Sequence, residues 1–309
     1  MTSIQQFTVD DFLSALDMPP GSAALIAPQV AKYDLSYRRL GVEERAALVR
    51  EVLARLDSFS KVGAHRYQIW DQSWSELAGR FAASGGALSS LEPSFIGASP
   101  VVRLGDDYAR PADPRFELYW FRILRLWLFK TYLAEFDRVL EFGCGSGYNL
   151  AALAELYPEK ELVGLDWSEA AVALVGRIGA TQDRRLIGRQ FDFFDPDPSL
   201  ALGKTSAVMT FAALEQTGTR FTRFLDWLLE RKPGLVINME PALELYDADR
   251  PFDQLAVRYH TGRDYLSGYF PGIRELANEG KAQILKLLRP RFGSLYHEGY
   301  SLLIWRPVD

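Results

Sequence analysis

Residues 138–149 read Arg-Val-Leu-Glu-Phe-Gly-Cys-Gly-Ser-Gly-Tyr-Asn, and this stretch decides the fold. Its first five residues form a short apolar run typical of a buried strand, and a helical pattern begins at Tyr148. Between the two lie Gly143, Gly145 and Gly147, in the pattern G-x-G-x-G. Glycines between a strand and a helix let the backbone turn sharply and approach a ligand closely. The stretch therefore predicts a ligand-binding loop at the edge of a sheet.

The chain after Asp137 continues this alternation of strands and helices. Further strands are predicted at residues 161–165, 186–194, 206–211 and 235–239, and helices at 148–157, from 168 and at 221–230. Such a βαβ rhythm requires a mostly parallel sheet covered by helices. The last two strands, 282–288 and 295–305, have no helix between them and should pair antiparallel. We therefore expect an α/β fold: a seven-stranded, mostly parallel sheet with helices on both faces and an antiparallel C-terminal hairpin.

The N-terminal third of the chain has a different pattern. Apolar residues recur at helical spacing over 22–59 and 65–81, and glycines and prolines then mark 85–114 as an irregular connector. A connector of this length is usually functional. We expect a helical N-terminal cap or lid over residues 1–114, followed by the cofactor-binding domain over 115–309. The side chains from this region expected to reach the bound molecules are Tyr108, Arg115, Tyr119 and Arg122.

Composition narrows the class of protein. The 309 residues are 48% hydrophobic and 24% charged, as in soluble globular proteins, and the net charge of -5 argues against a nucleic-acid partner. The most apolar stretch, 118–129, is too short to span a bilayer and contains Arg122 and Arg125. The first residues of the sequence show no signal-peptide pattern, so we expect a cytoplasmic enzyme that does not bind membranes. The single cysteine, Cys144, has no motif histidine beside it, so neither a nucleophile nor a metal site is expected. A homodimer is left open.

Two cofactor classes use a glycine loop of this kind. The dinucleotide fingerprint requires G-x-G-x-x-G, whereas Tyr148 occupies the position of its third glycine here. An acidic residue, Glu141, also precedes the first glycine by two positions. The pattern therefore disfavours a nicotinamide oxidoreductase.

Residues 137–240 resemble the class I S-adenosylmethionine-dependent methyltransferases. The loop from Glu141 to Gly147 matches the first motif of that superfamily, and residues 164–168, 191–194 and 209–216 resemble the second, third and fourth. The closing hairpin at 282–305 fits as well, because the superfamily's seventh strand is antiparallel. The resemblance implies S-adenosyl-L-methionine as the cofactor and a methyltransferase activity. It does not cover the first 110 residues.

The resemblance also implies which residues bind the cofactor. Asp166, at the end of the second strand, is expected to accept the ribose hydroxyls, and Asp192 with Phe193 to contact the adenine. Their alternatives are a helix cap and a bulge with a core phenylalanine. Trp167 either covers the adenine or merely packs. The residues expected around the rest of the cofactor are Glu141, Gly143, Gly145, Gly147 and Phe211, with Glu141 alternatively holding the loop through backbone hydrogen bonds.

The acceptor side is predicted to be acidic. Glu215 follows the fourth strand, Glu240 follows the fifth, and Glu244 comes four residues later. Carboxylates at this edge can bind a cation, take a proton or bond sugar hydroxyls, and His260 is a further candidate base. For Glu215 the alternative is the start of a helix, and for His260 a structural hydrogen bond. These four residues are the predicted catalytic set, acting on O or N of a small polar acceptor.

The sequence supports two hypotheses for the acceptor. Residues 240–265, 293–294 and 297–300 resemble a bacterial methyltransferase group associated with surface-polysaccharide genes, which implies a sugar-type acceptor. The competing reading is N-methylation of a guanidino or amino compound such as free arginine, with Glu215 paired to Glu240 or Glu244. The sequence spacing between Glu215 and Glu240 or Glu244 departs from the short double-glutamate loop of arginine methyltransferases. A non-catalytic adenosylmethionine-binding protein is the alternative from another class.

Overall fold

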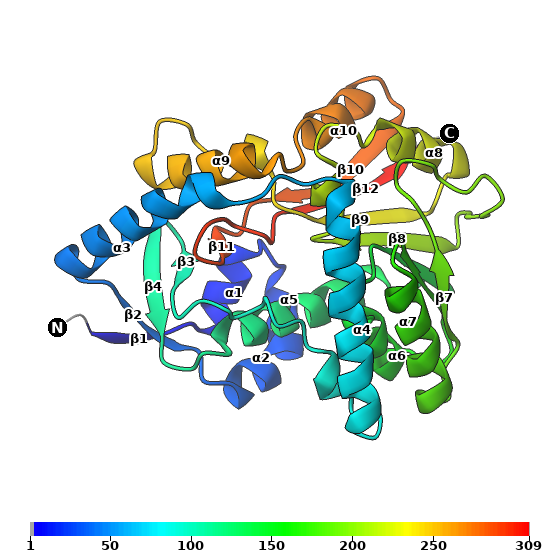
Figure 1. Ribbon diagram of the computed structural model, residues 1–309, viewed down its shortest axis with the longest axis horizontal. Coiled ribbons are helices and arrows are strands. Elements are labelled where there is room, and N and C mark those ends of the chain that lie inside the picture. The colour runs from blue at the N-terminus through cyan, green and yellow to red at the C-terminus, as the bar shows by residue number, and fades with distance from the viewer. Residues whose placement is uncertain (1–2, 309) are drawn as a thin grey trace.

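The computed structural model describes residues 3–308 and confirms the predicted seven-stranded sheet. Its strand order is β10-β12-β9-β8-β5-β6-β7 (Figure 1). The five adjacent strands from β9 to β7 run parallel to one another. Strand β12 lies between β9 and β10 and is antiparallel to both. The strands are β5 (Arg138–Phe142), β6 (Glu161–Asp166), β7 (Leu186–Gln190), β8 (Ser206–Phe211), β9 (Leu235–Met239), β10 (Ala282–Leu288) and β12 (Leu302–Pro307).

Helices cover both faces of this sheet because successive strand residues point to opposite sides. Val139 packs in one core cluster with residues of the helices α5 (Phe116–Tyr132), α6 (Tyr148–Leu156) and α7 (Glu169–Gln182). Its neighbour Leu140 packs in the other, with α8 (Thr222–Arg231) and α10 (Tyr269–Asn278). No helix of the described residues 3–308 is both long and apolar enough to cross a membrane.

The N-terminal region is helical as predicted, but it also contributes a second sheet that the sequence analysis did not anticipate. The sheet is antiparallel, with the order β1-β2-β4-β3-β11. Its strands are β1 (Ile4–Gln6), β2 (Ser36–Arg39), β3 (Val102–Leu104), β4 (Asp107–Pro111) and β11 (Phe292–Gly293). The remaining helices are α1 (Val9–Ala15), α2 (Ala23–Lys32), α3 (Val42–Arg55), α4 (Tyr67–Ala83) and α9 (Pro251–Arg263).

Two sequence predictions need correction here. The helical pattern over 22–59 is interrupted by β2, and the connector over 85–114 contains the hairpin β3–β4. These strands are only three to five residues long, and β2 is half-buried throughout while β3 is wholly buried. Such strands show no alternation of apolar and polar residues, so a periodicity test misses them.

The segment between β10 and β12 links the two sheets. The predicted last strand, 295–305, begins only at Leu302, because the residues before it leave the main sheet. The backbone N–H of Gly105 donates to the carbonyl of Arg291 (2.8 Å), and β11 pairs with β3. The guanidinium of Arg289 then bonds carboxylates of both Asp253 and Glu298, each at 2.6 Å. The loop 294–301 is thereby held against the N-terminal region.

Helix α4 runs across the front of the main sheet in Figure 1 and packs beside α7. The carboxylate of Asp71 on α4 accepts hydrogen bonds from the Ser168 hydroxyl (2.7 Å) and the Ala170 N–H (3.1 Å), at the N-terminus of α7. A carboxylate at this position interacts favourably with the helix dipole. The N-terminal region is thus fastened directly over the end of β6.

Candidate active site

A cavity of about 710 Å³ opens at the carboxyl ends of β5, β6 and β8, a volume typical of small-molecule sites, which span roughly 300–1,000 Å³. Its lining comes from several parts of the chain. These are the loops that follow the parallel strands, the segment from Gly63 to Trp74, residues 93–100, the loop 294–300, and side chains from α3, α5 and the segment from Tyr259 to Tyr265. The N-terminal region therefore closes a site that the main sheet begins.

The glycine loop has no room for side chains where it meets the cavity. Gly143 and Gly145 have φ of +69° and +49°, and both line the cavity. A Cβ on Gly143 would lie 2.3 Å from that of Ala213, and one on Gly145 would lie 2.7 Å from the Trp74 ring. Gly147, also at φ +69°, caps α6 and packs against Val175 and Ile178, outside the cavity lining.

We expect Gly145→Ala to weaken cofactor binding at least about tenfold. The new Cβ must displace the Trp74 ring and also adopt a left-handed backbone, which costs on the order of 1 kcal/mol or more. Calorimetric titration with S-adenosylhomocysteine measures the effect. The matched control is Gly176→Ala in α7, where no atom lies within 4 Å of the added Cβ. Equal affinities of the two variants would contradict the packing argument.

The acidic residues at the ends of β6 and β7, Asp166 and Asp192, both line the cavity. Asp166 accepts hydrogen bonds from the backbone N–H groups of Gly145 and Ser168, both at 2.9 Å, and its burial raises its pKa to about 6. Asp192, after β7, is exposed at the cavity wall with Phe193 beside it. Trp167 packs edge-on against Tyr67 of α4, with ring centroids 5.5 Å apart. Residues of the second and third motifs therefore line the same cavity.

Glu141 has an unused hydrogen-bonding oxygen in this lining. Its Oε1 accepts from the Asn149 side chain at 2.7 Å, whereas Oε2 is buried without a partner among residues 3–308. Burial raises the pKa of this carboxyl to about 8. A buried polar atom without a hydrogen-bond partner is costly. The site therefore suits a molecule that brings a polar group to this oxygen, such as an amino-acid moiety.

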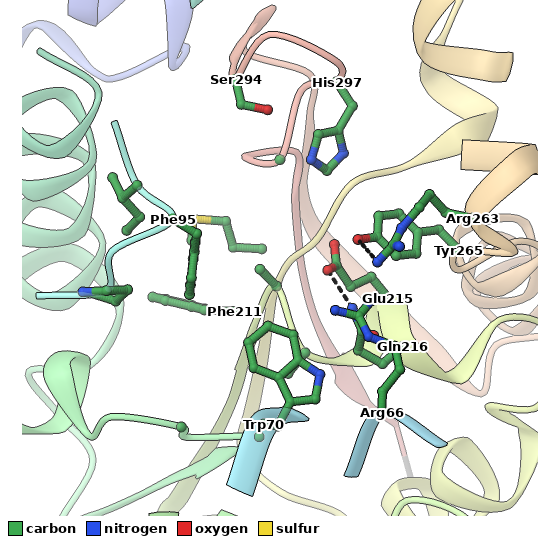
Figure 2. Close-up of a pocket in the computed structure, with 18 of the residues that line it drawn as sticks. Arg66, Trp70, Phe95, Phe211, Glu215, Gln216, Arg263, Tyr265, Ser294 and His297 are labelled. Atoms are coloured by element: carbon green, nitrogen blue, oxygen red, sulfur yellow. Dashed lines mark hydrogen bonds between the residues drawn. The ribbon is translucent and has the colours of Figure 1, made fainter. Parts of the chain in front are cut away.

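Glu215 lines the cavity across from the Phe211 ring (Figure 2). It lies in a short 3-10 turn (Leu214–Thr217) after β8, and the Gln216 side chain donates to its Oε1 at 2.8 Å. Figure 2 shows Glu215 and Gln216 on the same side as Arg66 and Arg263, across the cavity from the Phe211 ring. Burial first, and then the neighbouring carboxylate of Glu240, raise the pKa of Glu215 to about 8.

Three of the four predicted catalytic residues lie outside the cavity lining. Glu240 is fully buried, and its carboxylate accepts from the backbone N–H groups of residues 213, 214 and 215 at 3.1–3.2 Å. Glu244 accepts from the N–H of Gly268. His260 is buried, with its Nε2 3.2 Å from Nδ1 of His297. The spacing of these residues suggested a carboxylate cluster, but their side chains bond the protein itself.

His297 is the histidine that lines the cavity, from the loop 294–300. Burial and the nearby Arg103 and Arg263 lower its pKa to about 3, so its ring is neutral near pH 7. The described residues contain no cluster of three or more His, Cys, Asp or Glu side chains able to hold a metal ion.

The N-terminal side chains that line the cavity differ from the predicted ones. Tyr108 is buried and donates to the carbonyl of Leu295, Tyr119 stacks on Tyr33, and Arg115 and Arg122 pair with Glu92. All four contact other parts of the protein instead. The lining residues that sequence reasoning missed include Arg66, Trp70, Trp74 and Phe95. The spacing of the two tryptophans, four residues apart in a predicted helix, was the available signal, since it puts both rings on one face.

Comparison with family models assigns the central part of the chain. A model described as a methyltransferase domain matches residues 114–279, more than half of the chain. The chain belongs to this methyltransferase family. The methyltransferase therefore uses S-adenosylmethionine, as the motif pattern predicted.

Solved structures of three other methyltransferases align with parts of this methyltransferase. An O-methyltransferase from neocarzinostatin biosynthesis is 17% identical, with a TM-score of 0.40 over 64% of this chain but only 60% of its own. One from a trans-AT PKS multienzyme of Brevibacillus brevis is 15% identical, with a TM-score of 0.44 over 60% and 71%. A methyltransferase of Aquifex aeolicus is 13% identical, with a TM-score of 0.38 over 56% and 82%. No curated protein matches the chain.

Proposed function

We propose that the enzyme transfers a methyl group to a hydroxyl of a small polar acceptor bound beside Glu215. One observation carries this proposal: Glu215 is a cavity-lining carboxyl with a pKa of about 8, fixed by Gln216 after β8. An acid with a pKa near the working pH is well suited to accept a proton from the reacting group. A sugar, as the sequence analysis suggested, is one such hydroxyl-bearing acceptor.

The residues proposed to hold the cofactor line the same cavity. Asp166 would accept the ribose hydroxyls, Asp192 and Phe193 would contact the adenine, and Glu141 with the glycine loop would hold the amino-acid part. Their cavity-lining positions support these roles. When bound, S-adenosylmethionine supplies a methyl group activated by its positively charged sulfur.

The remaining work falls to the protein's own residues. Ionised Glu215 takes the proton of the acceptor hydroxyl, while Gln216 holds its other side. The rings of Trp70 and Trp74, stacked with centroids 5.5 Å apart, form part of the cavity wall. Positioning of the two reactants accounts for most of the catalysis in reactions of this kind.

The test is formation of S-adenosylhomocysteine with matched acceptors. Glucose, glucosamine, a simple phenol and free arginine are each incubated with the enzyme and cofactor. Turnover of hydroxyl acceptors, with the methyl group found on oxygen, is the expected result. Turnover of arginine alone would favour N-methylation, and cofactor binding without any turnover would favour the non-catalytic alternative.

We expect Asp166→Ala to lower cofactor affinity at least about tenfold, since a hydrogen bond to a charged group is worth roughly 1.5–3 kcal/mol. Because Asp166 also pins Gly145, Asp166→Asn serves as the companion variant that keeps the shape. Calorimetry with S-adenosylhomocysteine gives both affinities. An unchanged dissociation constant in folded Asp166→Ala protein would exclude the ribose role.

A further inference from the structure

Two arginines line the acceptor side of the cavity. Arg66 lies in the turn before α4, and Arg263 is the last residue of α9. Figure 2 shows both beside Glu215 and Gln216. The charges of both act on the Glu215 carboxyl, where they lower its pKa against the larger effect of burial. The acceptor side therefore combines one carboxyl with two guanidinium groups.

Neither guanidinium forms an ion pair within residues 3–308. Arg263 is buried, and it donates to the carbonyl of Ser60 and to the Tyr265 hydroxyl (3.2 Å), which leaves its Nε without a partner. Arg66 has two buried nitrogens without a partner, Nε and Nη1, and its guanidinium lies 5.1 Å from the centre of the Trp70 ring. A partly buried cation without a counterion is costly, and an anion beside it relieves that cost.

Several of the other titratable groups in the lining are neutral near pH 7. Glu215 is mostly protonated there, since its pKa is raised to about 8, and so is Glu141 for the same reason. His297 is neutral. The remaining carboxylates bond other groups: Asp166 accepts from the N–H of Gly145 and Asp192 from the N–H of Phe194. Glu51 and Arg55, on α3, pair with each other at 3.3 Å. The positive charges of Arg66 and Arg263 therefore remain without an ion-pair partner among the described residues at neutral pH.

We propose that the acceptor carries an anionic group, a carboxylate or a phosphate, which Arg66 and Arg263 bind next to the reacting hydroxyl. This proposal rests on the proposed function and narrows its substrate class. Guanidinium groups match the geometry of carboxylate and phosphate oxygens. A cationic acceptor such as free arginine would instead meet two like charges. The anion also fixes which hydroxyl faces Glu215.

The experiment compares sugars that share the same ring and carry a negative, a neutral or a positive substituent. The enzyme saturated with S-adenosylhomocysteine is titrated with glucuronate, glucose 6-phosphate, glucose and glucosamine, and with inorganic phosphate as the smallest probe. Tryptophan fluorescence reports binding, because Trp70 contacts Arg66. At constant ionic strength we expect the anionic sugars to bind at least about tenfold more tightly than glucose. The carboxylate and phosphate arms distinguish the two kinds of anion.

Arg66→Gln is expected to remove this preference, and Arg66→Lys to retain part of it. The matched control is Arg306→Gln, a surface change on β12 outside the cavity lining. The affinity for S-adenosylhomocysteine shows whether each variant is folded. Equal binding of charged and neutral sugars, no binding of any anion, or an anion preference that survives Arg66→Gln would overturn the proposal. Methyl transfer to glucose would still support the proposed function in each of these cases, so the two failures remain distinct.

Discussion

Glu215→Gln is expected to lower methyl transfer by about 10²–10⁴-fold, the range in which positioned proton acceptors contribute. The amide keeps the size of the side chain and cannot take the proton. Cofactor affinity should stay nearly unchanged, because Glu215 is not among the residues proposed to bind the cofactor and lies across the cavity from the Phe211 ring (Figure 2). Initial rates of S-adenosylhomocysteine formation and calorimetric titration measure the two quantities separately.

The pH dependence gives this prediction a second readout. The ionised form of Glu215 is the active one, and its pKa is raised to about 8. The rate should therefore rise about tenfold per pH unit below that value and level off above it. In Glu215→Gln this rise should disappear. The control is Glu230→Gln, the same chemical change at an exposed position on α8. A pH profile that is identical in the wild type and in Glu215→Gln would exclude Glu215 as the proton acceptor.

The sequence allowed the core of this fold to be predicted because its signals are local. The strand–glycine–helix unit at 138–149 and the apolar runs after it gave the strands and the closing hairpin directly. The same holds for Asp166, the last residue of β6, and for Asp192, just after β7, which must therefore lie at the carboxyl edge of the sheet. A residue placed directly after a parallel strand is positioned by the sheet itself.

The acceptor side could not be predicted in the same way, since it is assembled from distant parts of the chain. Arg66 and Arg263 meet only because α4 and α9 are both packed against the main domain, and no local pattern records that meeting. Glu215, Glu240 and Glu244 were predicted to act together at one edge because sequence spacing does not reveal the direction of a side chain. Glu240 points into the protein, where three backbone N–H groups occupy it.

Glu240 is expected to act through Glu215, and substitutions of it should show this. Glu240→Ala leaves three buried N–H groups without an acceptor, at about 1–3 kcal/mol each, so a large loss of stability is expected in thermal unfolding. Glu240→Gln keeps an oxygen for two of them but presents an amide group to the third. The turn that carries Glu215 then moves, and turnover should fall while cofactor affinity is retained.

The pH profile of Glu240→Gln separates this role from direct catalysis. The carboxylate of Glu240 is one of the causes that raise the pKa of Glu215. Without that negative charge the pKa of Glu215 should fall, and the rising limb of the rate profile should shift to lower pH. If Glu240 itself took the proton, Glu240→Gln would abolish the limb instead of shifting it, and Glu215→Gln would leave it in place. A rising limb that shifts in Glu240→Gln but disappears in Glu215→Gln would show that Glu215 takes the proton. It would also show that Glu240 acts by positioning Glu215.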